Sequence, residues 1–156
     1  MEKLKKGDKA PDFVLSDQNG ARVRRSDFAG KKLLLYFYPK AGTSGCTVQT
    51  EAVRDAQEEL AAGGVAVVGV SPDSEKSQKK FADKLSVSFP LLSDTEHTAA
   101  EAYGVWGEKT MYGKKYFGII RSSFLIDEQG KVVDAWYKVT PANTVPNVKK
   151  ALGLSS

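Results

Sequence analysis

Cysteine is almost absent from this sequence, in which Cys46 is the only one among 156 residues. A single thiol excludes an internal disulfide, and one cysteine with one histidine, His97, cannot supply the usual zinc ligand sets. A free cysteine without a disulfide framework fits a reducing compartment, so we expect a cytoplasmic protein.

Long apolar runs are also lacking, which argues against a membrane-spanning helix. The basic start, residues 1–6, leads into Gly7-Asp8-Lys9 with no apolar segment and so does not resemble a secretory signal. No glycine-rich dinucleotide or phosphate motif is present. The net charge of +4 comes from scattered lysines without a basic, aromatic-interleaved stripe, so we expect neither nucleic acid nor membrane as a partner.

The length and ordinary composition of the chain indicate one globular domain, residues 1–156, with a substantial core. Apolar patterns and turn residues predict short strands, amphipathic helices and two hairpins. The predicted elements are a hairpin over residues 12–23, strands at 32–38 and 65–70, helices at 47–60 and 74–85, an extended piece at 89–92, a short helix at 98–103, a loop at 105–118, a hairpin over 123–137 and a helix at 144–152.

A strand, a helix and a second strand in succession predict a right-handed crossover and a parallel pair. A parallel half followed by an antiparallel hairpin is typical of a thioredoxin-like α/β fold. We therefore expect a mixed central sheet flanked by helices, with an N-terminal β-hairpin.

Cys46 lies between the predicted strand at 32–38 and the predicted helix at 47–60. Unpaired N–H groups and the positive end of the helix dipole favour a thiolate there. The simpler interpretation is a small buried hydrophobic residue. Its polar and glycine neighbours at 42–45 favour a reactive thiol instead, because they form a tight turn in which the backbone can approach a small ligand.

The stretch PKAGTSGC, residues 39–46, resembles the Pro-x-x-x-Thr-x-x-Cys signature of peroxiredoxins. The wider context is similar to the bacterioferritin comigratory protein, or peroxiredoxin Q, subfamily from about residue 3 to residue 152. The segments that carry this likeness are LLLYFYPKAGTSGCTVQTEAVRD, GDKAPDF, AYGVWGEK and GIIRSSFLID.

The resemblance implies a thiol peroxidase that reduces hydrogen peroxide and small alkyl hydroperoxides without a metal or prosthetic group. Cys46 would be the nucleophile, and Arg121 would stabilise its thiolate and the charge developing on the peroxide. Thr43 would hydrogen-bond the thiol or the peroxide, and Pro39 would shape the loop and shield the sulfur. The N–H groups of residues 45 and 46 would assist. For Arg121 a structural salt bridge is the alternative, for Thr43 helix capping, and for Pro39 a simple end to the strand.

The chain departs from its relatives in two places. Many members carry a second, resolving cysteine five residues after the first, where this chain has Glu51, and a proline where it has Ser44. The sulfenic acid formed on Cys46 would therefore need an external thiol. The candidates are a small thiol, a thioredoxin-like or glutaredoxin-like protein, or Cys46 of another copy. We expect Glu51 to be exposed, so that its charge affects Cys46 little.

Two other functions stay open at this point. A thioredoxin-fold redox sensor or binding protein would be oxidised once without turnover, and a structural module would hold an inert thiol. A Cys46–His97 hydrolase pair is disfavoured, because His97 fits a polar helix start. The aromatic residues of the 105–118 loop, from Trp106 to Phe117, either pack over the sheet edge or form a collar around the peroxide pocket. A monomer and a weak homodimer are both compatible with the sequence.

Overall fold

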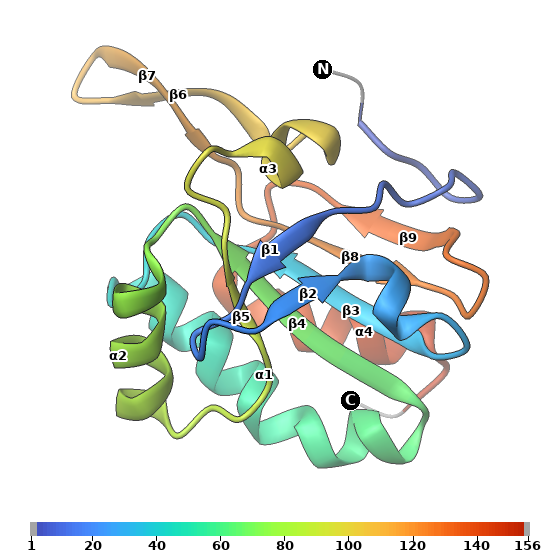
Figure 1. Cartoon of the computed structure of the whole chain (residues 1–156). Helices are drawn as coiled ribbons and strands as arrows, with labels where there is room; N and C mark the ends of the chain where they lie inside the picture. The colour runs from blue at the N-terminus through green and yellow to red at the C-terminus, as the bar shows by residue number, and fades with distance from the viewer. Residues whose placement is uncertain (1–2, 155–156) are drawn as a thin grey trace.

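The computed structural model describes residues 3–154, so Met1 and Glu2 of the basic N-terminal start lie outside the described residues. Its main feature is a seven-stranded mixed sheet in the order β2-β1-β5-β4-β3-β8-β9 (Figure 1). The strands of this sheet are β1 (Val14–Ser16), β2 (Arg22–Arg24), β3 (Lys32–Phe37), β4 (Val65–Ser71), β5 (Leu91–Ser93), β8 (Ser122–Ile126) and β9 (Val132–Trp136). The helices are α1 (Ser44–Ala62), α2 (Glu75–Leu85), α3 (Thr98–Ala102) and α4 (Thr144–Ala151), with short 3-10 turns η1 (Arg25–Phe28) and η2 (Pro141–Asn143).

The centre of the sheet is built from two crossovers, of which the sequence predicted the first. β3 pairs parallel to β4 through α1, and β4 pairs parallel to β5 through α2. β8 then joins the other side of β3 in the antiparallel direction and continues into β9, while the hairpin of β1 and β2 closes the opposite edge. This is the predicted thioredoxin-like arrangement, including the N-terminal hairpin.

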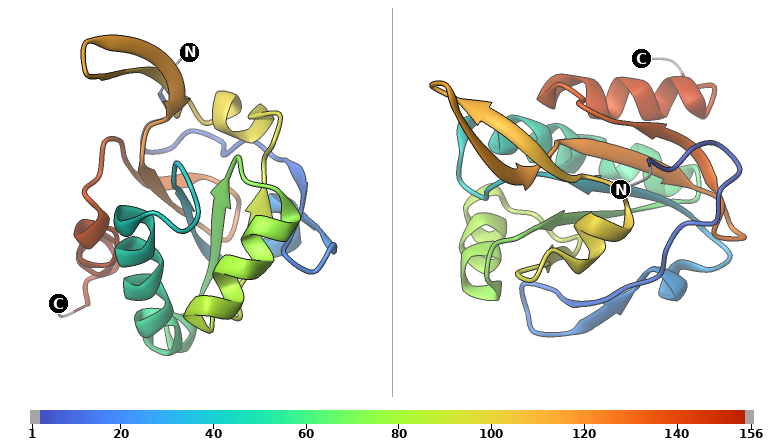
Figure 2. Two further views of the ribbon diagram at one scale, coloured as in Figure 1. Left: turned by 90° about the vertical axis from the view of Figure 1, so that its left-hand side faces the viewer. Right: turned by 90° about the horizontal axis from the view of Figure 1, so that it is seen from above.

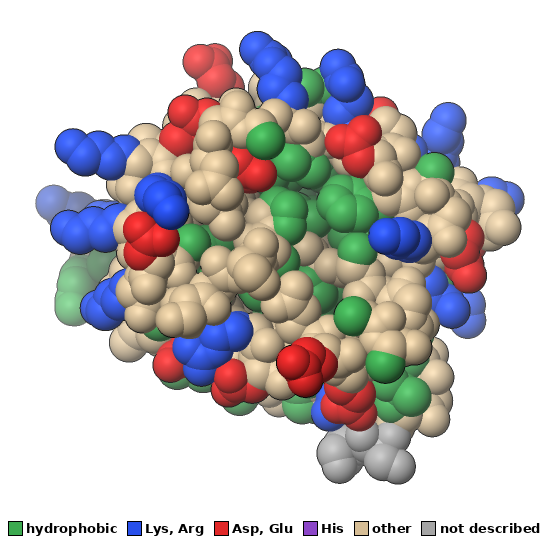
Figure 3. All heavy atoms as spheres, turned by 60° about the horizontal axis from the view of Figure 1, so that its bottom comes forward, with side chains coloured by type: hydrophobic (Ala, Val, Ile, Leu, Met, Phe, Trp, Pro, Cys, Tyr) green, Lys and Arg blue, Asp and Glu red, His purple; other side chains and the backbone are tan. Residues whose placement is uncertain are grey.

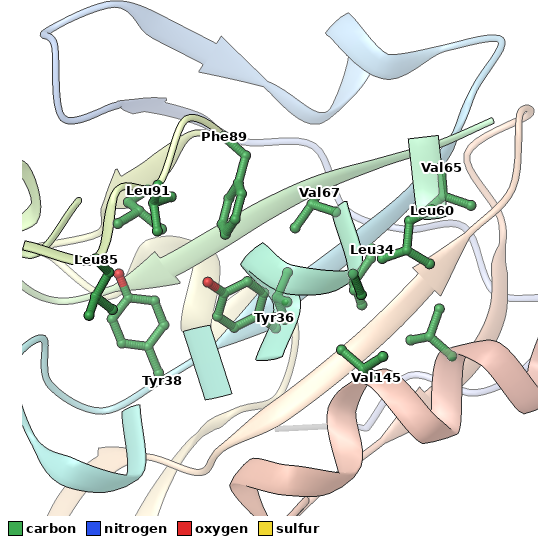
Figure 4. Close-up of a cluster of buried hydrophobic side chains, with 14 of the residues drawn as sticks. Leu34, Tyr36, Tyr38, Leu60, Val65, Val67, Leu85, Phe89, Leu91 and Val145 are labelled. Atoms are coloured by element: carbon green, nitrogen blue, oxygen red, sulfur yellow. The ribbon is translucent and has the colours of Figure 1, made fainter. Parts of the chain in front are cut away.

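Alternation along β3 divides the core into two layers. Leu34 and Tyr36 face a cluster made with α1, α2 and α4, which Figure 4 shows in close-up. Leu33, Leu35 and Phe37 face a second cluster, formed with α3 and the N-terminal segment. Each face of the sheet is thus covered, and Figure 2 shows α1 and α2 side by side on one of them. This explains why β3 is a near-continuous apolar run rather than an alternating one.

The prediction of a loop at 105–118 is wrong, because this segment forms a separate two-stranded hairpin of β6 (Trp106–Met111) and β7 (Lys114–Ile119). Its turn places Tyr112 and Gly113 at φ of +53° and +76°, as a two-residue type I′ connection requires. Tyrosine is rare at such a position. Because most residues of both strands are exposed, no alternating pattern reveals them in the sequence.

The helix at 47–60 was predicted from an apolar stripe of Val48, Ala52, Val53, Ala56 and Leu60, and this stripe is wrong in one position. Val48 is 47% exposed, whereas the polar residues Gln49 and Thr50 are fully buried. Hydrogen bonds explain the burial of both side chains, since Thr50 bonds the Tyr36 hydroxyl and Gln49 bonds groups at the site described below. The buried face of α1 is therefore rotated toward the polar residues near its N-terminus.

A hollow of about 410 Å³ opens at the end of the sheet where β4 begins. Val65, which lines it, pairs with Lys32 at the start of β3, so the hollow lies at the opposite end of the sheet from Cys46.

Figure 3 shows the bottom face of the molecule, where hydrophobic side chains gather among acidic and basic ones. Across residues 3–154 no helix combines the length and the apolar character that a bilayer crossing demands.

Candidate active site

Cys46 lies in the first turn of α1, whose N-cap residue is Thr43. None of its surface is exposed. The first N–H groups of an α-helix have no partner within the helix, and the Thr43 side chain makes no capping hydrogen bond here. The thiol is therefore buried beside the positive end of the helix dipole, and this end of the dipole favours negative charge on the sulfur.

Arg121 is the cation beside this thiol. Its Nη2 donates to Cys46 Sγ at 3.4 Å, across 75 positions of sequence. The antiparallel pairing of β3 with β8 makes this contact, because it sets Ser122 opposite Phe37, at the end of β3 from which the chain turns into α1. Cys46 and Arg121 thus meet as sulfur and guanidinium, the arrangement that stabilises a thiolate.

Gln49 fixes the orientation of the guanidinium, and sequence reasoning missed it. Its Oε1 accepts a 2.7 Å hydrogen bond from Arg121 Nη1, and its Nε2 donates to Thr144 Oγ1 at 2.9 Å. Both Gln49 and Thr144 are fully buried. The available signal was the helical spacing, because a residue three positions after Cys46 shares its face of α1.

Gly45 allows this close packing. A Cβ atom at this position would lie 3.0 Å from Arg121 Nη2 and 3.4 Å from Pro141 Cγ. The sequence indicated close approach of the backbone to a ligand, whereas the structure shows close approach to the guanidinium itself. Any larger residue here would push Arg121 away from the sulfur.

Thr43 and Pro39 frame the loop before α1. The Thr43 hydroxyl donates to the Lys40 carbonyl at 2.8 Å, and in the described part of the chain it makes no hydrogen bond with Cys46. The oxygen lone pairs of Thr43 remain able to accept a bond from a bound hydroperoxide. Pro39 is partly buried and follows directly after Tyr38, whose N–H still bonds the Val70 carbonyl.

Glu51, at the position where many relatives carry a second thiol, lies 3.9 Å from the Arg54 guanidinium, and its side chain is 44% exposed. Its charge is therefore partly paired and partly screened by solvent, and Arg54 also contacts Asp55. Ser44, the other departure, is an exposed residue at the start of α1.

A second cation, Lys109, is close enough to Arg121 and Cys46 to interact with their charges. Partial burial lowers the pKa of Lys109, the positive charge of Arg121 lowers it further, and the negative charge of Cys46 acts in the opposite direction. Its Nζ donates to the carbonyl of Ile119, two residues before Arg121. Burial raises the pKa of Tyr36, a member of the same buried cluster as Cys46, well above its usual value, and the Cys46 charge adds to this effect, so Tyr36 stays neutral.

One alternative expected the aromatic residues of the β6–β7 hairpin to pack over the sheet edge, and only Trp106 does so, against the core cluster that contains Phe37. Tyr112 is 98% exposed and Phe117 is 61% exposed, and the hairpin projects from the body of the molecule (Figures 1 and 2).

The His97 ring stacks on the Trp106 ring with 3.8 Å between centroids, and its Nδ1 lies 3.7 Å from Glu101 Oε2. Among residues 3–154 no group of three or more His, Cys, Asp or Glu side chains is arranged to hold a metal ion.

Comparison with known proteins shows which family the chain belongs to. The model of the AhpC/TSA family matches residues 6–135. Peroxiredoxin Bcp of Escherichia coli K12 is 52% identical over 132 residues, 85% of each chain, and that of Bacillus subtilis 168 is 44% identical over 146 residues, 94% of this chain and 93% of the relative. A peroxiredoxin Q mutant structure from Xylella fastidiosa superimposes with a TM-score of 0.91 at 31% identity, over 98% of both chains.

The chain therefore belongs to the AhpC/TSA family. Its fold is that of the solved peroxiredoxin Q structures, and its most similar relatives define the group within the family. Within the family it is a peroxiredoxin of the bacterioferritin comigratory protein, or peroxiredoxin Q, group, an enzyme of the thiol peroxidase class.

Proposed function

We propose that this peroxiredoxin reduces hydrogen peroxide and small alkyl hydroperoxides at Cys46 in a one-cysteine cycle. The observation that carries the proposal is the 3.4 Å contact between Arg121 Nη2 and Cys46 Sγ at the start of α1. A bacterioferritin comigratory protein of Xanthomonas campestris, solved as an intermediate and ligand complex, is described as having alkyl peroxide reduction activity. That relative is 39% identical over 90% of both chains, with a TM-score of 0.85.

In the proposed reaction the Cys46 thiolate attacks one peroxide oxygen, and the O–O bond breaks. The sulfur becomes a sulfenic acid, and the second oxygen leaves as hydroxide or alkoxide and takes up a proton. Arg121 stabilises the thiolate before attack and the negative charge on the departing oxygen during it. Because Gln49 already orients the guanidinium, little reorganisation is needed when the charge develops.

Around this pair, the remaining polar groups have supporting roles. The N–H groups of Gly45 and Cys46 donate toward the peroxide from the helix start. The Thr43 hydroxyl already donates its hydrogen to the Lys40 carbonyl, so it accepts a hydrogen bond from the peroxide O–H. Pro39 shapes the loop and limits access of water to the sulfur.

The cycle closes with an external thiol, because the sequence contains no second cysteine. A small thiol, a thioredoxin-like or glutaredoxin-like protein, or Cys46 of another copy would attack the sulfenic sulfur. The proposal also includes a monomer or weak homodimer that works in the cytoplasm as a single domain over residues 1–156. The absence of a disulfide framework supports this location.

Peroxide consumption at substoichiometric enzyme, with several thiol donors, tests the proposal. The expected result is continued turnover with at least one donor and none for Cys46→Ser. A single stoichiometric oxidation followed by arrest, with every donor, would instead identify a redox sensor. Slow alkylation of Cys46 that rises only at alkaline pH would identify an inert thiol.

A further inference from the structure

A small cleft lies beside the active-site loop, on the side of α2. One wall is formed by Ala41 and Gly42, between β3 and α1, and the other by residues of α2. The cleft encloses about 250 Å³, and its α2 wall consists of Ser77, Lys80, Phe81 and Lys84. These four residues are spaced as one face of a helix, so the whole face of α2 points at the loop. We call this space the α2 cleft.

The mouth of the α2 cleft is positively charged. Lys80 and Lys84 are exposed, and neither forms an ion pair with any residue in the 3–154 range. Lys79, on the other face of the same helix, is paired with Asp83 at 2.9 Å. Two ammonium groups one helical turn apart are complementary to a ligand with carboxylates.

The floor of the α2 cleft adjoins the core around the sulfur. Phe81 packs on Tyr38 at 5.8 Å between ring centroids, and Tyr38 and Cys46 belong to the same buried cluster, on which Ala41 also packs. The loop wall therefore separates the cleft from the thiol. If this wall moves, a ligand in the α2 cleft comes next to Cys46.

The wall is held by few bonds. The Ala41 N–H donates to Asp73 Oδ2 at 2.7 Å, and Asp73 lies in the turn between β4 and α2. Gly42 is exposed at a φ of +86° with open space where a Cβ would be. A single anchor followed by a glycine allows the segment to swing away from α2 without disturbing the sheet.

We propose that the α2 cleft is the docking site for the reductant, and that this reductant is a small thiol carrying carboxylates. The inference rests on the proposed function and specifies the donor class. The sequence has no other thiol, so the reductant must come from outside the chain. It must also reach a sulfur that is fully buried. Lys80 and Lys84 hold the carboxylates while the donor sulfur faces the loop.

The chemistry balances with two donor molecules. The first donor thiolate attacks the Cys46 sulfenic sulfur, an S–S bond forms, the S–O bond breaks, and the oxygen leaves as water after protonation. A second donor thiolate attacks the sulfur of the first, releasing Cys46 as a thiolate and the donor as its disulfide. The two donors lose two electrons, which restore the cysteine.

Single-turnover reduction of the oxidised full-length protein tests this inference. Cys46 is oxidised with one equivalent of hydrogen peroxide and mixed with dianionic mercaptosuccinate, neutral mercaptoethanol or cationic cysteamine, each rate being divided by the thiolate fraction of that donor. We expect mercaptosuccinate to react fastest. In Lys80→Gln/Lys84→Gln its rate should fall about tenfold, as the loss of two solvent-exposed ion pairs predicts, and that of mercaptoethanol should hardly change.

Lys76→Gln/Lys79→Gln is the matched control, because it also removes two positive charges from α2, at residues that do not line the cleft, and it should keep the wild-type preference. An equal rate for the three donors in the wild type, or an equal effect of both sets of variants, would overturn the inference. If peroxide fails to oxidise Cys46, the proposed function fails. The inference is then tested by the same donors on a Cys46–thionitrobenzoate mixed disulfide, where the charge preference must still appear.

Discussion

At the scale of single residues, a chain of hydrogen bonds holds the group that faces the sulfur. Cys46 contacts Arg121, Arg121 contacts Gln49, and Gln49 contacts Thr144. Each bond uses a different atom pair, so the guanidinium has one orientation in which both of its terminal nitrogens are used. The absence of a side chain at Gly45 leaves room for it.

Gly45→Ala tests the space requirement. The added methyl group would lie 3.0 Å from Arg121 Nη2, so the guanidinium must shift away from the sulfur. We expect the rate of peroxide reaction to fall about tenfold, equivalent to about 1.4 kcal/mol of lost transition-state stabilisation, with the fold retained. Stopped-flow tryptophan fluorescence measures the rate. Ser44→Ala, at an exposed neighbouring position, should react at the wild-type rate, and an equally fast Gly45→Ala would contradict the space requirement.

Gln49→Leu tests the positioning role of the buried amide. The variant leaves Arg121 Nη1 and Thr144 without their partner, which costs about 1–3 kcal/mol of unfolding free energy in chemical denaturation. It should also slow the peroxide reaction. Gln49→Glu keeps an acceptor oxygen for Arg121 and should recover most of the rate. If the rate of Gln49→Leu equals that of the wild type, Gln49 has a structural role only.

Lys109 gives a pH-dependent prediction. Because burial lowers its pKa, the folded protein releases this proton at a lower pH than the unfolded chain, whose lysine pKa is about 10.4. Between the two values the unfolded state binds more protons, so stability rises with pH. The wild type should therefore gain stability relative to Lys109→Met as the pH increases from neutral toward about 10. Denaturant unfolding of the two proteins at several pH values measures this difference, and a difference that stays constant across this range would contradict the prediction.

At the scale of secondary-structure elements, three connections bring the site together. The β3–α1 connection presents the thiol, the entry into β8 presents the arginine, and the start of α4 supplies Thr144. The β4–α2 turn adds a fourth contact, because Asp73 bonds both the Ala41 N–H and the Ser71 hydroxyl, each at 2.7 Å. The active-site loop is thus fixed to the β4–α2 turn on one side and open to solvent on the other.

Asp73→Ala tests whether this anchor keeps the loop closed. Without the carboxylate the Ala41 N–H loses its acceptor, so the loop should open more often and expose Cys46. We expect faster trapping of the sulfenic acid by dimedone, by roughly tenfold or more, as the loss of a hydrogen bond to a charged group, about 1.5–3 kcal/mol, implies, together with slower peroxide reaction. Ser77→Ala, on the α2 wall, is the control. Unchanged trapping in Asp73→Ala would show that the loop opens elsewhere.

At the scale of the whole molecule, the parts predicted from the sequence are those set by local patterns. The apolar runs at 32–38 and 65–70 predicted β3 and β4, the amphipathic pattern at 47–60 predicted α1, and their order along the chain predicted a parallel pair. The place of Cys46 at the start of a helix followed from the same pattern. The meeting of Cys46 with Arg121 depends on β8 lying beside β3, which the family resemblance suggested and local spacing could not.

What sequence reasoning missed has a physical cause in each case. Gln49 is polar yet fully buried, because its amide hydrogen-bonds Arg121 and Thr144, which are distant in sequence. Hydrophobic periodicity cannot predict such hydrogen-bond partners. For Val48, periodicity predicted a buried position, but the polar residues Gln49 and Thr50 are buried instead and Val48 is exposed. The β6–β7 hairpin buries little of its surface, so no alternation marks its strands, and a tyrosine takes a turn position usually held by Asn, Asp or Gly.

The most direct test of the central claim is rapid mixing of hydrogen peroxide with the wild type, Arg121→Ala and Arg121→Lys, alongside the pH dependence of Cys46 alkylation. A guanidinium that stabilises both the thiolate and the departing oxygen predicts a fall of about a hundredfold or more in Arg121→Ala, as for other removed oxyanion donors. It also predicts an alkylation profile shifted to higher pH and only partial recovery in Arg121→Lys. An Arg121→Ala protein that folds normally and reacts with peroxide as fast as the wild type would contradict it.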